Sequence, residues 1–165
     1  MVETAMKISL NVLKNKHKDA AEMIKTLSLL PVGVDSEMMS KIFGTKWKET
    51  VKKLIHHSLV HCRDTGGPKY YSVHPSIIIH VENEISQEEK LKLHEKISEE
   101  YLNRIYKVYK YIGTLSNSSQ RAQEQFLSED ENYKAIIFRE LSFVGFKNKI
   151  KKLYFNLFQA DYTDD

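Results

Sequence analysis

Apolar residues near the start of the chain recur at helical spacing. Residues 2–30 predict helix in two segments that meet near the KNKHKD stretch, residues 14–19. The second segment has one apolar face, formed by Ala20, Met23, Ile24, Leu27 and Leu30. Pro31 and Gly33 follow it, and such residues end helices.

Two further helices are predicted before residue 60. Asp35 is a suitable N-cap for a short helix over residues 36–43, and Gly44 closes that helix. Residues 45–58 (TKWKETVKKLIHHS) predict a third helix. One of its sides is apolar (Trp47, Val51, Leu54 and Ile55), and the lysines lie largely away from that side (Lys48, Lys52 and Lys53).

The pattern then changes from helix to strand. SLVHCR (residues 58–63) and KYYSVH (residues 69–74) predict two short strands. The residues between them favour a hairpin loop, namely Asp64, Gly66, Gly67 and Pro68. Three helices followed by a hairpin is the element order of a winged helix-turn-helix, with the hairpin as the wing.

The chain after the wing is predicted to be helical. Pro75 suits the first position of a helix over residues 75–83, and Ser86 with Glu89 forms a capping box that opens a long helix. The apolar line of the long helix is Leu91, Ile97, Tyr101, Ile105, Val108 and Ile112. Residues 113–119 (GTLSNSS) form a linker, and ENYKAIIFREL predicts another helix. The sequence therefore predicts a mostly α chain, with a winged-helix domain over residues 1–85 and an α-helical domain or linker over residues 86–165.

Composition narrows the class of protein. The 165 residues are 41% hydrophobic and 28% charged, as in ordinary globular proteins. No apolar run approaches the roughly 18 residues that span a bilayer, so no membrane partner is predicted. Cys62 is the single cysteine and no signal peptide is visible, which favours a cytoplasmic location. The net charge of +3 is too small to indicate a nucleic-acid partner by itself.

Two stretches resemble the winged-helix region of STAND-type signalling ATPases, the NB-ARC lineage. The family pattern "SL..L" then "LS.LP.G" is matched by Ser9-Leu10, Leu13, Leu27-Ser28, Leu30-Pro31 and Gly33. KKLIHHSLVHCRDTGGPKYYSVHP resembles the family's wing segment. FLSEDENYKAIIFREL resembles the helix that leads such proteins into a repeat array. The resemblance implies a regulatory module that couples nucleotide state and protein–protein contacts to domain rearrangement.

The resemblance assigns a role to His74. In this family the last wing strand ends in Met-His-Asp, whose histidine contacts the β-phosphate of ADP in the closed state. The matching triplet here is Val73-His74-Pro75, so only the histidine is retained. The resemblance implies that His74 senses a nucleotide phosphate held mainly by another domain. The alternative is that His74 only caps the helix that starts at Pro75.

The chain carries no phosphate-binding loop of its own, because no G-x-x-x-x-G-K-[ST] motif occurs. It is therefore not expected to act as an enzyme or to bind a cofactor alone. ADP or ATP would be bound in the context of a larger protein, and a P-loop ATPase module, in the same parent chain or in trans, is the implied partner. The helical segment is expected to contact protein partners.

The main alternative is a DNA-binding transcription regulator. The third helix occupies the recognition-helix position, and the lysines able to hold phosphates are Lys46, Lys48, Lys52, Lys53 and Lys69. The helix lacks arginine, asparagine and glutamine, the side chains that best recognise base edges. A third possibility is a winged helix used only for protein docking.

The sequence gives little support for a metal site or for a catalytic nucleophile. The candidate metal ligands are His56, His57, His61, Cys62, His74 and His80, but no C-x-x-C or H-E-x-x-H spacing occurs. Cys62 and His61 do not form a dyad, because neighbours on a strand face opposite sides. The tyrosines and phenylalanines from 101 to 158 are predicted to pack between helices, with a partner surface as the alternative, and an acidic membrane is a further alternative for the terminal KNKIKKLYFNLF segment.

Overall fold

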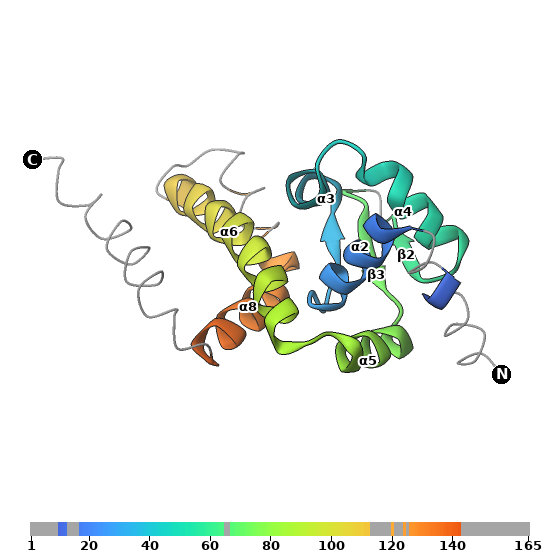
Figure 1. The fold of residues 1–165 in the computed structure, drawn as a ribbon. Coiled ribbons are helices and arrows are strands. Elements are labelled where there is room, and N and C mark those ends of the chain that lie inside the picture. Colours follow the sequence, from blue (N-terminus) through green and yellow to red (C-terminus); the bar gives the residue numbers. More distant parts are fainter. Residues whose placement is uncertain are drawn as a thin grey trace, which may run out of the picture. The chain divides into compact units, whose positions relative to one another are not determined.

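The computed structural model describes residues 10–12, 17–64, 67–112, 120, 124 and 126–142, with the backbone alone at 107–112 and 138–142. The predicted linker at residues 113–119 and the basic segment near the C-terminus lie outside the described residues, as do Thr65 and Gly66 in the wing loop. The described part is mostly helical and contains a small antiparallel sheet (Figure 1). The predicted mostly α fold, a winged helix followed by helices, is confirmed.

The three helices of the winged helix lie where the pattern predicted them. They are α2 (Lys18–Ser28), α3 (Ser36–Phe43) and α4 (Trp47–His56). The apolar face of α2 is buried, and α2 contacts α4, α5 and β3. Asp35 caps α3 as predicted, because its Oδ1 accepts a 2.7 Å hydrogen bond from the N–H of Met38. Gly44 follows α3 with a φ of 72°.

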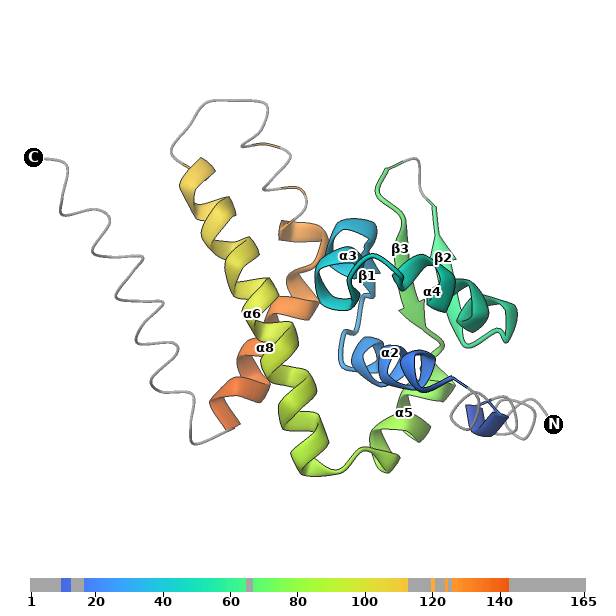
Figure 2. The ribbon, with the colours of Figure 1, turned by 45° about the horizontal axis from the view of Figure 1, so that its top comes forward.

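The sheet has one more strand than the sequence predicted. Strands β2 (Val60–Arg63) and β3 (Tyr70–Val73) form the expected hairpin, visible in Figure 2, and β1 (Val34–Asp35) pairs with the other edge of β3. All pairings are antiparallel. Two residues are too few to show a strand alternation, which explains why β1 was missed.

Gly33 explains how β1 reaches β3. Its φ is +81°, and a Cβ atom at this position would lie 2.6 Å from the carbonyl oxygen of Tyr71. Only glycine combines a left-handed conformation with such a close backbone approach. Tyr71 in turn packs edge-on against Trp47, with the ring centroids 5.2 Å apart, and so joins the sheet to α4. Burial is the main cause that raises the pKa of Tyr71 above its ordinary value.

The helices after the wing begin at the predicted residues. They are α5 (Pro75–Glu84), α6 (Gln87–Ile112) and α8 (Asp130–Ser142). Pro75 occupies the first turn of α5. In the predicted capping box, the N–H of Glu89 donates to Ser86 Oγ at 3.2 Å. None of the helices in the described ranges is both long and apolar enough for a membrane crossing.

The chain divides into two compact units, Met1–Glu100 and Tyr101–Asp165. The division falls inside α6, later than the predicted boundary after residue 85. The first half of α6 belongs to the winged-helix unit because its side chains bind α2. Lys25 Nζ lies 2.7 Å from Glu89 Oε1, and Lys96 Nζ lies 3.1 Å from Glu22 Oε1.

The apolar line predicted for α6 is only partly correct. Ile97 and Tyr101 are buried, but Leu91 is 37% exposed. The buried stripe instead begins at Leu93 and includes polar residues, namely His94, Ser98 and Arg104. In the second unit, Tyr101 and Arg104 interact with residues at and next to the start of α8. Asn132 Nδ2 donates to the Tyr101 hydroxyl at 2.9 Å, and Arg104 Nη1 lies 2.6 Å from Glu129 Oε1.

Candidate functional site

The backbone fixes His74 at the junction between the wing and α5. Strand β3 ends at Val73, which pairs with Val60 of β2. The N–H of His74 donates to the Leu59 carbonyl oxygen at 3.4 Å, which continues the strand pairing for one more residue. Its φ of −62° and ψ of 134° are extended, and the helix starts at the next residue. His74 is therefore the N-cap of α5.

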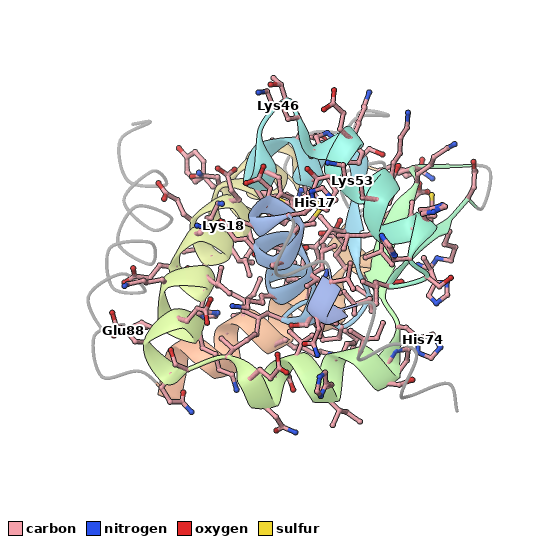
Figure 3. All side chains as sticks on the ribbon, turned by 45° about the vertical axis from the view of Figure 1, so that its right-hand side comes forward. His17, Lys18, Lys46, Lys53, His74 and Glu88 are labelled. Carbon is pink, nitrogen blue, oxygen red and sulfur yellow. The ribbon has the colours of Figure 1, made fainter. Side chains whose placement is uncertain are left out.

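The His74 ring has one nitrogen engaged within the chain. Nδ1 lies 3.3 Å from the backbone nitrogen of Ser76 and 2.7 Å from Ser76 Oγ. A backbone N–H can only donate, so Nδ1 is the acceptor and a neutral His74 carries its hydrogen on Nε2. The side chain is half-buried, and Figure 3 shows it at the periphery of the winged helix. The helix cap fixes the ring and leaves Nε2–H as the donor for an external group.

His61 lies next to His74. It is exposed on β2, and the two ring centroids are 5.3 Å apart with 49° between the planes. A second pair, His56 and His57, lies at the end of α4 with centroids 5.5 Å apart. The sequence showed His61 and His74 as separate candidates. The signal that relates them is the hairpin register. His61 lies opposite Ser72 in the antiparallel pairing, so His74, two residues further along, is its diagonal neighbour on the same face of the hairpin.

The predicted DNA-contacting lysines are exposed, but they do not all share one environment. Lys48, Lys52 and Lys53 are exposed on α4, and no ion pair is found for them within the described ranges. Lys48 Nζ lies 5.9 Å from the centroid of the Trp47 ring. Lys69 is paired with Asp64 at 3.3 Å, and this partner raises the pKa of Lys69. The positive charge of Lys69 is thus partly neutralised by Asp64 and is less available to a phosphate.

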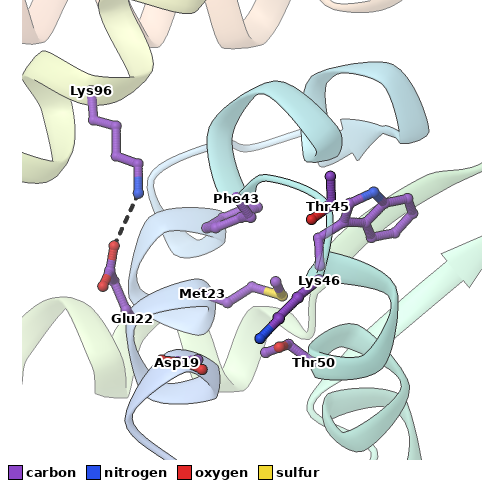
Figure 4. Close-up of a pocket in the computed structure, with 9 residues that line it drawn as sticks. Asp19, Glu22, Met23, Phe43, Thr45, Lys46, Thr50 and Lys96 are labelled. Atoms are coloured by element: carbon purple, nitrogen blue, oxygen red, sulfur yellow. Dashed lines mark hydrogen bonds and ion pairs between the residues drawn. The ribbon is translucent and has the colours of Figure 1, made fainter.

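Lys46 lies apart from both the wing and His74 (Figure 3), and it lines a cavity of about 410 Å³. Residues of α2, α3, α4 and α6 and of the turn before α4 form this cavity (Figure 4). Its floor includes the buried side chains of Met23 and Trp47. Its rim carries the Glu22–Lys96 ion pair together with Asp19 and Lys46. The opposite charges on the rim cancel, so the cavity does not favour an anionic ligand.

Metal ligands do not gather in the part of the chain that the structure describes. No group of three or more histidine, cysteine, aspartate or glutamate side chains is placed to hold an ion there. Cys62 is an exposed free thiol on β2, opposite Tyr71 in the strand register. The site with the most definite polar geometry is therefore the histidine pair, His61 and His74.

Comparison with protein-family models, with curated proteins and with solved structures gives no match for this chain.

Proposed function

We propose that this chain is the regulatory winged-helix and helical module of a STAND-type signalling ATPase. In this proposal, His74 Nε2–H donates to a phosphate of ADP or ATP that is held by a P-loop module, in the same polypeptide or in trans. The observation that carries the proposal is the commitment of His74 Nδ1 to Ser76, which fixes the ring and leaves Nε2–H as the outward donor. The module itself performs no chemistry and works in the cytoplasm.

A contact of this kind converts nucleotide state into domain arrangement. A ligand shifts a conformational equilibrium only by its differential affinity for the two states. A hydrogen bond from His74 to a phosphate that is present in one nucleotide state stabilises the arrangement in which the winged helix lies against the nucleotide. The phosphate acceptor is charged, so this hydrogen bond from the neutral ring would be stronger than one between two neutral groups.

The test uses the native gene product that contains this sequence, purified with its bound nucleotide. His74→Leu removes the donor, and we expect the variant to lose its bound ADP and to shift toward the active arrangement. His80→Leu is the control, because His80 lies on the same helix and binds Glu84 at 3.1 Å. Unchanged ADP retention and unchanged activity in His74→Leu would contradict the proposal.

The helical unit, residues 101–165, supplies the protein-docking part of the proposal. On α8, Ile137 is 41% exposed, and Leu127 near its start is 71% exposed. Exposed aliphatic side chains of this size are common on monomers, so they support docking only together with the resemblance to the helix that leads into a repeat array. Partner binding should therefore depend on this helix and not on His74.

DNA binding is the second candidate, and one observation favours it. The outward lysines of α4, Lys48, Lys52 and Lys53, have no acidic partner within the described ranges, so their charge is available to phosphates. Duplex binding should then show a steep salt dependence. Lys52→Gln with Lys53→Gln should lower the slope of log K against log salt by about 2.

The control for the DNA test is Lys90→Gln with Lys92→Gln on α6, where Lys92 already pairs with Glu88 at 2.7 Å. Both pairs of substitutions remove two positive charges, so a general effect of net charge would lower the slope equally in both. Equal slopes, or no binding to duplex DNA at physiological salt, would exclude α4 as a recognition helix.

A further inference from the structure

We infer that His61 is a second donor of the anion site, so that the phosphate is held by a pair of imidazoles and not by His74 alone. This inference rests on the proposed function, since it concerns the same ligand, but it adds a binding residue that the family resemblance does not assign. The ligand class is a phosphate or pyrophosphate group of a nucleotide presented by another domain.

The geometry of the two rings supports this inference. Their centroids are 5.3 Å apart and their planes are tilted by 49°, so the rings are neither stacked face to face nor perpendicular. His74 is fixed through Nδ1, and its free edge is Nε2. His61 is exposed, and within the described ranges no hydrogen bond or ion pair is found for it. Two rings whose centroids lie this close can direct a donor each at one phosphate or pyrophosphate group.

The charges around the pair also favour an anion. Within the described ranges no carboxylate bonds either ring. The charged side chains of the hairpin are Arg63, which is held over the Tyr70 ring at 5.5 Å, and the Asp64–Lys69 pair. On α5 the carboxylate of Glu84 is occupied by His80. A ligand phosphate would therefore meet donors and cations in this part of the surface.

A purely structural role for His61 is the rival explanation. In that case His61 only packs against the His74 ring and keeps it in place. The two roles differ in what an aromatic replacement does. His61→Phe keeps a ring beside His74 but removes both nitrogens, so it preserves packing and abolishes hydrogen bonding. His56→Phe makes the same change at the exposed member of the other histidine pair and serves as the matched control.

The experiment titrates the full chain with inorganic pyrophosphate and follows the imidazole nitrogens by NMR. In the unmodified chain we expect the resonances of His61 and His74 to shift together, with one dissociation constant. His61→Phe should weaken pyrophosphate binding by roughly tenfold, the value of one hydrogen bond to a charged group. His56→Phe should bind as the unmodified chain does.

The outcomes separate the two proposals. One outcome is that His61→Phe binds pyrophosphate as tightly as the unmodified chain while His74→Phe binds it less tightly. In that case His61 only packs against His74 and is not a second donor, although the proposed role of His74 stands. If His74→Phe retains full binding, the phosphate role of His74 is wrong as well. If pyrophosphate shifts the resonances of neither His61 nor His74 in the unmodified chain, the proposal that both rings bind one phosphate group is wrong.

Discussion

The two units of this chain bury different kinds of side chain. The core of the winged-helix unit is largely aliphatic. Its buried polar side chains include Asp35, which caps α3, and the hydroxyl groups of Thr26 and Ser98, which donate to the backbone of their own helices. The helical unit buries an ion pair and an amide–phenol hydrogen bond. Arg104 is 5% exposed and Glu129 is 0% exposed, and Asn132 is also fully buried beside Tyr101.

This difference indicates that the units depend on different physical effects. An aliphatic core is stabilised by removing apolar surface from water and is sensitive to shape. A buried ion pair gains little net stability, but loss of one partner leaves an uncompensated charge and is costly. Shape changes should therefore be most harmful in the winged helix, and changes of polarity should be most harmful in the helical unit.

The largest expected effect is the loss of one member of the buried ion pair. Arg104→Met leaves the Glu129 carboxylate without its guanidinium, and we expect the free energy of unfolding to fall by about 3–5 kcal/mol. The double variant, Arg104→Met with Glu129→Leu, removes both charges and should recover most of that loss. Urea denaturation, followed by far-UV circular dichroism, measures the free energy of unfolding of each single variant and of the double variant. A double variant that loses as much stability as Arg104→Met and Glu129→Leu lose in sum would show that the two side chains are not coupled.

The sequence predicted α2 better than α6, and the side chains that each helix buries explain why. In α2 most of the buried side chains are apolar, so the spacing from Ala20 to Leu30 predicted the buried face correctly, although Thr26 and Ser28 are buried as well. In α6 the buried stripe includes the polar residues His94, Ser98 and Arg104. Apolar periodicity therefore predicted Leu91 to be buried, but Leu91 is exposed. Burial of a charge depends on a partner such as Glu129, which is remote in sequence.

The candidate site was likewise predictable only in part. The break between strand and helix at Pro75 located His74 and predicted a helix cap, whereas its phosphate role was implied only by the family resemblance. The structure shows the cap, and the phosphate role stays a prediction. The adjacency of His61 could not be obtained from composition or spacing, because it depends on the hairpin register, which pairs Val60 with Val73. The wing loop between the strands does not fix that register by its sequence.

The second expected effect tests shape in the winged-helix unit. Gly33→Ala places a methyl group 2.6 Å from the Tyr71 carbonyl oxygen at a φ of +81°, so β1 must separate from β3. We expect a loss of about 2–4 kcal/mol in the free energy of unfolding. Gly44→Ala is the control, because Gly44 has a φ of +72° but no atom within 4 Å of the new methyl group. Gly44→Ala should lower the free energy of unfolding by about 1–2 kcal/mol.

Thermal or urea unfolding of both glycine variants separates conformational strain from steric collision. The difference between them measures the collision with β3, since both positions have a left-handed φ. Equal losses would mean that β1 can move away from β3 at no cost, and the sheet would then contribute little to the stability of the winged helix.

The third effect concerns Tyr101 and depends on pH. Burial, together with the Glu129 carboxylate, raises the pKa of Tyr101 well above its ordinary value. The neutral phenol therefore contributes stability that is complete below the ordinary tyrosine pKa of about 10 and is lost as pH rises above it. Tyr101→Phe should cost about 1 kcal/mol at neutral pH, through the lost hydrogen bond from Asn132.

At alkaline pH the same variant should lose less stability than the unmodified chain, because phenylalanine does not ionise. Unfolding curves at neutral pH and above pH 10 give the comparison. The control is Tyr106→Phe, on the same helix at a half-buried position. If Tyr101→Phe and the unmodified chain lose stability in parallel as pH rises, ionisation of Tyr101 does not contribute to alkaline unfolding.

The smallest effect is expected at the partly exposed ion pair between α2 and α6, which contrasts with the buried pair in the other unit. Lys25 and Glu89 lie 2.7 Å apart, with side chains 21% and 40% exposed. Pairs in contact with water contribute little, so Glu89→Gln should cost about 0.5 kcal/mol, and added salt should reduce that cost. Glu88→Gln is the control, because Glu88 pairs with Lys92 within a single turn of α6. If Glu89→Gln costs as much as Arg104→Met, the first half of α6 is held to the winged helix by charge, and the contrast between an aliphatic and a polar unit is wrong.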